Sequence, residues 1–251
     1  MTSGRIDEIV RAQFRIDTNC SIEDEKAKII NINKAELKAG SRYFDDLESF
    51  FRAIIYHGEM YMCADSMILD WCREKYSLYK PEWFCKFENL RELDRKLNEF
   101  GYAIKDTHVY CLPDIDFEGY DFDVPYNLKW YDQEDILKLK EGNSFNNALM
   151  FIPDCPDVIA VAALDEDGAP IAMAGASRDS DSLWQIGIDV FPEYRHRGLA
   201  VCLVSMLKDR ILEMGKVPFY GTSESHSNSL NVAVRSGFMP AFTEVFCHRI
   251  T

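Results

Sequence analysis

One short segment near the end of the chain combines a strand end, a turn and a helix start in an order suited to binding phosphate. An apolar run ends at Pro192, and the pattern Arg195-x-x-Gly198-x-Ala200 follows. The first backbone N–H groups of a helix have no partner within it and lie at the positive end of its dipole. The two small residues would let a diphosphate approach that backbone, and the basic residues 195–197 add charge. The segment predicts a site for a nucleotide-type cofactor.

The elements that must position this segment can be followed from residue 126 onward. Apolar alternation, turn residues and helix caps define each of them. Asp132 and Asp135 mark a helix start, the turn 165–168 joins a hairpin, and Gly237 is a left-handed helix stop. The predicted elements are strand 126–130, a helix from 132 to about 142, strands 158–164, 170–176 and 183–190, a helix from 199 to about 214–215, strand 217–223, a short helix capped by Ser227 or Asn228 with Leu230, Ala233 and Val234 inward, and strand 238–249.

This order of elements, together with two motifs, resembles the GNAT N-acetyltransferase superfamily. The first motif is Arg195-x-x-Gly198-x-Ala200, and the second is Ser229-x-x-Val232-Ala233-x-x-x-Gly237-Phe238. The resemblance covers about half of the chain, from 126 to 251. It implies an α/β (α+β) GNAT fold, in which helices flank a mixed, mostly antiparallel twisted sheet.

The resemblance also implies an activity, which is transfer of an acetyl group from acetyl-coenzyme A to a primary amine by direct attack in a ternary complex. The acceptor would be a small molecule or a peptide. The strand before the turn would pair with the pantetheine arm, and the turn itself would hold the pyrophosphate. The predicted cofactor-binding residues are Ile188, Asp189, Val190, Arg195, His196, Arg197, Gly198, Leu199, Ala200 and Asn228.

Two proton transfers need further side chains, one from the acceptor ammonium and one to the departing thiolate. Many family members place a tyrosine as the thiolate acid where this chain has Ala233. Tyr220 on the neighbouring strand is the replacement that we consider. Glu224 is the first candidate base, and His226 and Asp189 are the alternatives. Because the usual tyrosine is missing, a weak or inactive coenzyme A-binding sensor or scaffold is the alternative function.

The N-terminal half resembles a decayed copy of the same fold. The segment Gly101-Tyr102-x4-Thr107-His108-Val109-Tyr110-Cys111 matches Gly237-Phe238-x4-Thr243-Glu244-Val245-Phe246-Cys247 without gaps. Its predicted elements are a helix with Leu47, Phe50, Phe51, Ile54 and Ile55 on one face, strands 59–63, 83–86 and 102–111, and helices around 68–76 and 90–100. The region 59–64 lacks the Arg-x-x-Gly-x-Ala pattern, so one cofactor per chain is expected. We predict a degenerate GNAT-like domain over 1–112, an acidic linker over 113–125 and an acetyltransferase domain over 126–251.

Composition excludes several other classes of protein. The formal net charge is −14 and the only compact basic cluster is 195–197, which argues against nucleic acid as a partner. No apolar run is long enough to span a membrane, and the charged start of the chain is unlike a secretory signal, which predicts a cytoplasmic protein. The eight cysteines are scattered without metal-ligand spacing, so no metal site is expected. The acceptor amine and the oligomeric state stay open.

Overall fold

The structure, a computed structural model, describes residues 1–42, 50–119 and 125–250. Leu47 and linker residues 120–124, which enter the predictions above, lie outside these ranges. The chain divides into two compact units. Unit 1 comprises Met1–Ile9 and Cys111–Pro240, and unit 2 comprises Val10–Tyr110 and Ala241–Thr251. The two units are defined by contacts within the structure, whereas the predicted domains are defined by a duplication of the sequence. The domain limits at 112 and 126 therefore stay a prediction.

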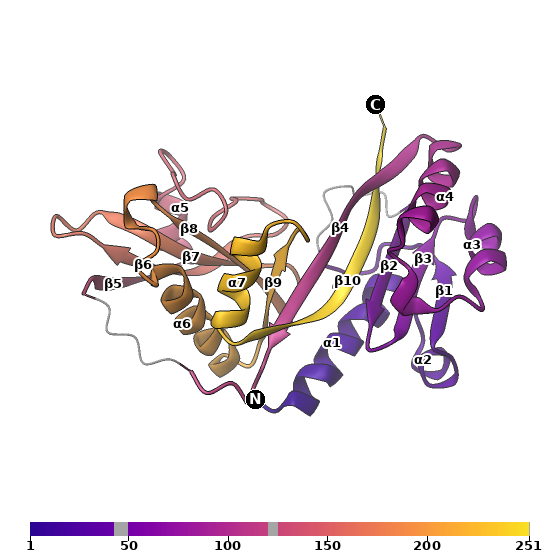
Figure 1. Ribbon diagram of the computed structural model, residues 1–251, viewed down its shortest axis with the longest axis horizontal. Coiled ribbons are helices and arrows are strands. Elements are labelled where there is room, and N and C mark those ends of the chain that lie inside the picture. The colour runs from indigo at the N-terminus through magenta and orange to yellow at the C-terminus, as the bar shows by residue number, and fades with distance from the viewer. Residues whose placement is uncertain (43–49, 120–124, 251) are drawn as a thin grey trace. The chain divides into compact units, whose positions relative to one another are not determined.

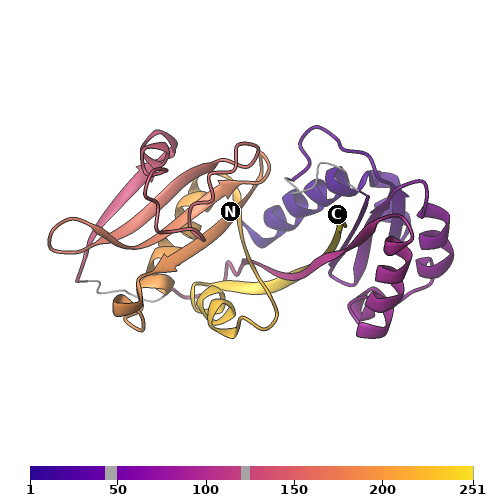
Figure 2. The ribbon, with the colours of Figure 1, turned by 90° about the horizontal axis from the view of Figure 1, so that it is seen from above.

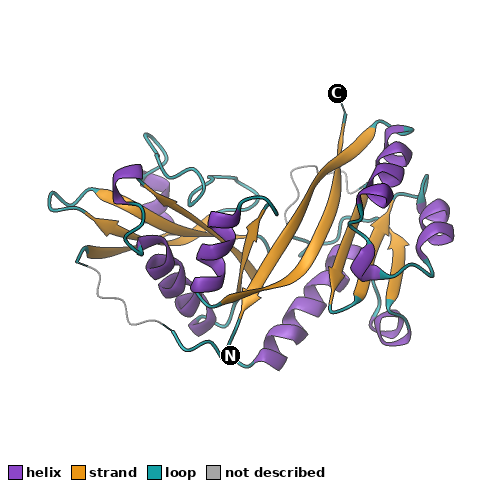
Figure 3. Cartoon of the chain, in the orientation of Figure 1, coloured by secondary structure: helices purple, strands orange, loops and turns teal. Residues whose placement is uncertain are grey.

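Ten strands in the described ranges follow the hydrogen-bonded order β1-β3-β2-β10-β4-β9-β8-β7-β6-β5. The pairs β1–β3 and β8–β9 are parallel, whereas β2–β3, β2–β10, β5–β6, β6–β7 and β7–β8 are antiparallel. Helices lie between groups of these strands along the chain and pack beside the sheet (Figure 1, Figure 3). The predicted fold class, a mixed and mostly antiparallel sheet flanked by helices, is confirmed.

Unit 1 contains most of the elements predicted from residue 126 onward. Strand residues alternate between the two faces of the sheet, and each face is covered. Leu203 and Leu207 of α6 pack with Ala174 on one face, while Ala162 packs with Ile136 of α5 on the other. Seen from above, α5 and α7 lie on opposite sides of these strands (Figure 2). The elements are β5 (Asn127–Asp132), α5 (Gln133–Lys138), β6 (Asp157–Leu164), β7 (Pro170–Arg178), β8 (Leu183–Val190), η2 (Pro192–Tyr194), α6 (Leu199–Glu213), β9 (Val217–Thr222) and α7 (Ser227–Arg235).

Unit 2 contains the elements of the N-terminal half. Three elements, α1, β4 and β10, contribute residues to both units. Gly101 and Gly237 have φ of 79° and 78°, and each is followed directly by a 12-residue strand, β4 or β10. This likeness fits the duplication hypothesis, which stays a hypothesis. The elements are α1 (Ser3–Thr18), α2 (Ile22–Ala27), β1 (Ile30–Lys34), β2 (Phe51–Tyr56), β3 (Glu59–Ala64), α3 (Leu69–Tyr76), η1 (Pro81–Trp83), α4 (Phe87–Asn98), β4 (Tyr102–Pro113) and β10 (Phe238–Arg249).

Several predictions of local structure are wrong. The helix expected around Phe50–Ile55 is strand β2. The segment 83–86, expected to be a strand, consists of the last residue of the 3-10 helix η1 (Pro81–Trp83) and the turn that follows it. Neither Ser227 nor Asn228 caps α7, because the N-cap is His226 and it makes no side-chain capping hydrogen bond. Val234, expected to face inward, is 46% exposed.

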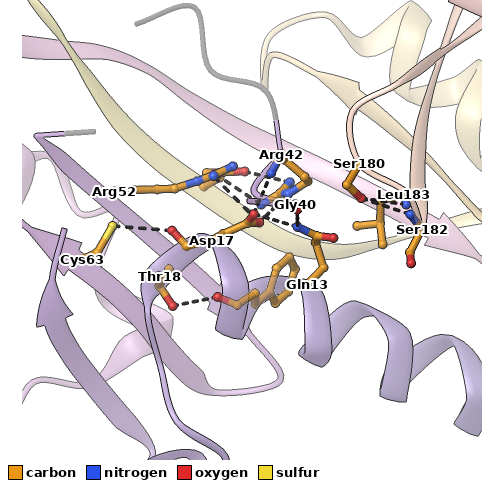
Figure 4. Close-up of polar contacts among 12 residues, drawn as sticks. Gln13, Asp17, Thr18, Gly40, Arg42, Arg52, Cys63, Ser180, Ser182 and Leu183 are labelled. Carbon is orange, nitrogen blue, oxygen red and sulfur yellow. Dashed lines mark hydrogen bonds and ion pairs between the residues drawn. The ribbon is translucent and has the colours of Figure 1, made fainter. Parts of the chain in front are cut away.

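Four charged side chains are buried together in unit 2. Asp17 accepts hydrogen bonds from the backbone N–H (2.8 Å) and Nε (2.7 Å) of Arg42. Glu244 on β10 accepts from Nε of Arg52 and lies 3.2 Å from Nη1 of Arg42. None of the four side chains is more than 4% exposed. Figure 4 shows Arg42 and Arg52 converging on Asp17. We call these four residues the buried charge cluster, and it joins α1, β2, β10 and the segment around Arg42.

Candidate functional site

The predicted phosphate-binding segment forms an open turn, residues 195–200, between β8 and α6. His196 and Gly198 have φ of 62° and 82°, so the chain reverses sharply before α6 begins at Leu199. Between Arg195 and Cys202, no backbone N–H of the described chain has an intramolecular acceptor; that of Cys202 donates to Gly198 O at 3.0 Å. A Cβ placed on Gly198 would have nothing within 4 Å. Free donors beside open space are what a diphosphate needs.

Two arginines of the 195–200 turn are held by neighbouring groups. Arg195 donates from Nε to the carbonyl of Val190 (3.1 Å). Arg197 donates to the Tyr126 hydroxyl (2.7 Å) and to the carbonyl of Glu193 (2.9 Å). His196 is exposed. These contacts fix the two guanidinium groups beside the turn, so their charge is preorganised for an anion. The residues of the turn therefore fit a pyrophosphate.

Strands β8 and β9 separate next to this turn. Their parallel register runs from Leu183↔Val217 to Gln185↔Phe219, although β8 continues to Val190 and β9 to Thr222. Ile188, Asp189 and Val190 of the predicted pantetheine strand lie in the separated part of β8. An unpaired strand edge can accept an extended ligand as an added strand. The gap thus leads from the 195–200 turn to the last paired residues, Gln185 and Phe219.

Tyr220 is the first β9 residue beyond the last paired one. Its side chain is buried, and its hydroxyl lies 2.9 Å from Oγ of Ser229 on α7. Burial raises the pKa of Tyr220 above its ordinary value, an effect that the Ser229 hydrogen bond opposes only in part. Tyr220 is therefore a protonated phenol where the two strands part.

Asp189 on β8 is engaged with the loop after α5. Its Oδ2 accepts from the backbone N–H groups of Asn147 (2.7 Å) and Ala148 (3.0 Å), and its Oδ1 accepts from Nδ2 of Asn147 (2.5 Å). The loop lies directly on the sheet, because a Cβ on Gly187 would be 1.8 Å from the carbonyl oxygen of Asn147. These hydrogen bonds anchor the loop to Asp189. The role of Asp189 as a base stays a prediction.

Comparisons with known proteins identify the family to which this part of the chain is similar. Residues 121–238 match the family model described as the Acetyltransferase (GNAT) family. Residues 121–238 form a GNAT acetyltransferase domain. No curated protein matches the chain significantly. None of the described helices combines the length and apolar character needed to cross a membrane.

Three solved structures illustrate what the chain is similar to. A GCN5-related N-acetyltransferase-like protein from Streptococcus suis is 16% identical, with TM-score 0.48, and the match covers 97% of this chain and 100% of that one. A GCN5-related N-acetyltransferase from Kribbella flavida is 18% identical, with TM-score 0.44 and coverage of 62% and 63%. A GNAT superfamily phosphinothricin acetyltransferase from Sinorhizobium meliloti, in complex with AcCoA, is 21% identical, with TM-score 0.36 and coverage of 51% and 89%.

The other predicted site residues of the GNAT domain lie on the segment that joins β9 to α7. Glu224 is exposed two residues after β9 ends, His226 is the exposed N-cap of α7, and Asn228 is exposed in its first turn. Their assignment as base or cofactor contact stays a prediction.

Sequence reasoning misses several polar residues of the GNAT domain. The sequence places Ser229 only within a motif, yet this residue is the partner of the Tyr220 hydroxyl. No local pattern singles out Asn147, although it contributes two of the hydrogen bonds to Asp189. Gly175 and Gly187 face each other in the β7–β8 register, and paired glycines in neighbouring strands signal a close backbone approach.

Replacing Gly187 by alanine is expected to release the loop from the sheet. The new Cβ would overlap the Asn147 carbonyl, so the loop must shift and the hydrogen bonds to Asp189 must lengthen. Amide hydrogen exchange at Asn147 and Ala148 should become at least about tenfold faster. Gly4→Ala, at a site with nothing within 4 Å, is the control. Unchanged protection of both amides in the Gly187 variant would refute the proposed anchoring.

Proposed function

We propose that this protein transfers an acetyl group from acetyl-coenzyme A to a primary amine of a small molecule or peptide, by direct attack in a ternary complex. The match of residues 121–238 to the acetyltransferase family indicates acetyl transfer in general. The observation that carries the finer proposal is the open 195–200 turn at the mouth of the gap between β8 and β9. A location in the cytoplasm stays a prediction.

Two neighbouring segments would bind different parts of acetyl-coenzyme A. The N–H groups of 196–200 and the guanidinium groups of Arg195 and Arg197 would hold the pyrophosphate. The separated edge of β8, Ile188–Val190, would pair with the pantetheine amides. Bound acetyl-coenzyme A supplies a thioester carbonyl carbon that is open to attack by an amine. Holding that carbon and the amine together in one complex would account for much of the rate.

Two proton transfers complete the proposal. Tyr220 keeps its proton because burial raises its pKa, and it lies where β8 and β9 part, so we assign it the proton that the departing sulfur needs. Glu224 or His226 would take the proton of the acceptor ammonium, since Asp189 already accepts three hydrogen bonds from the loop. Ser229 holds the Tyr220 hydroxyl in place.

Thiol release from acetyl-coenzyme A in the presence of a panel of primary amines tests the proposal. Release that depends on the amine supports transfer.

A second function is favoured by Ala233, which occupies the position where many family members carry a tyrosine. On that alternative the protein binds coenzyme A as a sensor or scaffold. Thermal stabilisation by acetyl-coenzyme A without turnover on any amine would favour the second function over the first.

Tyr220→Phe is expected to lower kcat by about 100-fold, the usual contribution of a general acid. The Kd of coenzyme A should stay within about twofold, because the phenol is placed at the sulfur and not at the phosphates. Ser229→Ala removes only the orienting hydrogen bond, so a smaller loss is expected. Steady-state thiol release and calorimetric titration measure the two quantities. A Tyr220 variant with wild-type kcat would remove this residue from the mechanism.

A further inference from the structure

A row of polar side chains crosses the GNAT sheet on the face opposite α6. Asp157 of β6 is paired with Ser177 of β7, and Ser177 is paired with Gln185 of β8. Paired residues of antiparallel strands point to the same face with their Cβ atoms about 5 Å apart. Further along, the same face carries Ala160 and Met173, which pack toward α5 and not toward α6.

Asp179 links this row to the gap between β8 and β9. One of its carboxylate oxygens, Oδ2, accepts from the Ser177 hydroxyl (2.9 Å) and from the backbone N–H of Gln185 (3.3 Å). Gln185 is also the β8 residue paired with Phe219 at the last step of the β8–β9 register. The carboxylate of Asp179 is therefore tied to the residue beside which the two strands begin to separate.

An unpaired carboxylate oxygen of Asp157 is an independent reason to expect a ligand here. Its side chain is 5% exposed, and Oδ2 accepts from the backbone N–H of Phe151 (2.8 Å). Its second oxygen, Oδ1, is buried and has no hydrogen-bond partner among the described residues. A buried oxygen without a donor costs free energy unless a bound group satisfies it.

The neighbouring thiol does not supply the missing charge balance. Cys155 is 4% exposed, and burial, followed by the charge of Asp179, raises its pKa to about 12. The thiol is thus neutral at physiological pH, so the acidic groups of the row are the carboxyls of Asp157 and Asp179. Burial raises the pKa of Asp157, an effect that backbone N–H groups such as that of Phe151 oppose, and a bound cation would favour the ionised form. Such a site favours a compact cation with several N–H donors.

We propose that Asp157, Ser177 and Asp179 form the subsite that binds the ammonium group of the acceptor, which makes the acceptor a cationic primary amine. The inference rests on the proposed transferase function, because it places the amine beside the gap that would hold the thioester. A protonated amine offers three N–H donors, and the row offers the carboxylate of Asp179, the Ser177 hydroxyl and the bare Oδ1 of Asp157.

The test compares a charged probe with a neutral one of the same shape. Butylamine, protonated at pH 7, and butanol are titrated into the full-length protein with coenzyme A present, and binding is followed through protein amide chemical shifts. Trialanine amide, which has a free N-terminal amino group and no terminal carboxylate, is the second cationic probe. We expect both amines to bind and butanol not to bind. Asp179→Asn, which keeps an oxygen for Ser177 and Gln185, should weaken amine binding at least tenfold.

Two further variants make the outcome decisive. Asp157→Asn should also weaken amine binding, and it is an independent check if the Asp179 variant unfolds. Asp181→Asn changes an exposed carboxylate on the same turn and should change nothing. If the wild type binds neither amine, or if Asp179→Asn and Asp157→Asn both keep wild-type affinity, the subsite is refuted. If the wild type does not bind coenzyme A, the proposed function is refuted instead. Failure of the subsite and failure of the proposed function therefore give different results.

Discussion

Gly198→Glu should raise the Kd of coenzyme A by more than about 100-fold, a free-energy loss of roughly 2.7 kcal/mol. Gly198 has φ of 82°, and its Cβ position opens into the space beside the unpaired N–H groups of the 195–200 turn. A glutamate there would direct a negative charge into the place proposed for two phosphoryl groups. It would also strain the backbone by about 1 kcal/mol. Calorimetric titration with coenzyme A measures the effect directly.

The opposite end of the same helix offers a matched control. Gly215, just beyond α6, has φ of 75°, and a Cβ placed on it would have nothing within 4 Å. Gly215→Glu therefore introduces the same charge and a similar backbone strain away from the turn. It should leave the Kd of coenzyme A unchanged within about twofold. Binding by the Gly198 variant that equals binding by the Gly215 variant would show that the turn does not hold the pyrophosphate.

Much of unit 1 follows from local sequence signals. Asp132 accepts a hydrogen bond from the backbone N–H of Asp135 (3.0 Å), so the predicted helix start is confirmed at atomic detail. Strand β10, which begins in unit 1 and continues into unit 2, also has the predicted bounds, Phe238–Arg249, because Gly237 ends one element and a long apolar alternation defines the next. Caps, turns and periodicity act over a few residues, and one sequence is enough to interpret them.

Unit 2 is harder to predict because its apolar signals are ambiguous. Phe51–Tyr56 is an almost continuous apolar run, so its residues match helical spacing as well as strand spacing. The run is a strand buried along nearly its whole length. Helix α1 is absent from the elements that we predict, although Ile6, Val10 and Phe14 recur every four residues and are all buried. Its many charged residues obscure that signal.

The site shows the same division between local and distant information. The 195–200 turn is contiguous, so its residue types and spacing predict an anion site without knowledge of the fold. The anchoring of Asp189 depends on Asn147, which is 42 residues away. The row formed by Asp157, Ser177 and Gln185 depends on the register of three strands, including an irregularity in β6 between Asp157 and Ile159. A single sequence does not contain that register.

Burial of two acids with two arginines also makes unit 2 sensitive to single substitutions. Asp17→Asn is expected to lower the free energy of unfolding by about 3–5 kcal/mol. The amide can still accept a hydrogen bond from Arg42, but Arg42 and Arg52 would then share only the charge of Glu244. Asp70→Asn, which alters the exposed pair with Arg73, should cost less than about 1 kcal/mol. Denaturant unfolding of both variants measures the difference.

Acid titration examines the same interaction without a mutation. Burial raises the pKa of Asp17, but attraction to Arg42 and Arg52 outweighs burial and holds the pKa below its ordinary value of 3.8. In the unfolded chain the carboxyl regains that ordinary value, so below about pH 4 the unfolded state binds the extra proton. The contribution of Asp17 to stability is therefore complete above this range and is lost as the pH falls through the folded-state pKa. The wild type should lose stability more steeply than Asp17→Asn over this interval, and parallel curves for the two proteins would mean that Asp17 is not held ionised by the buried charge cluster.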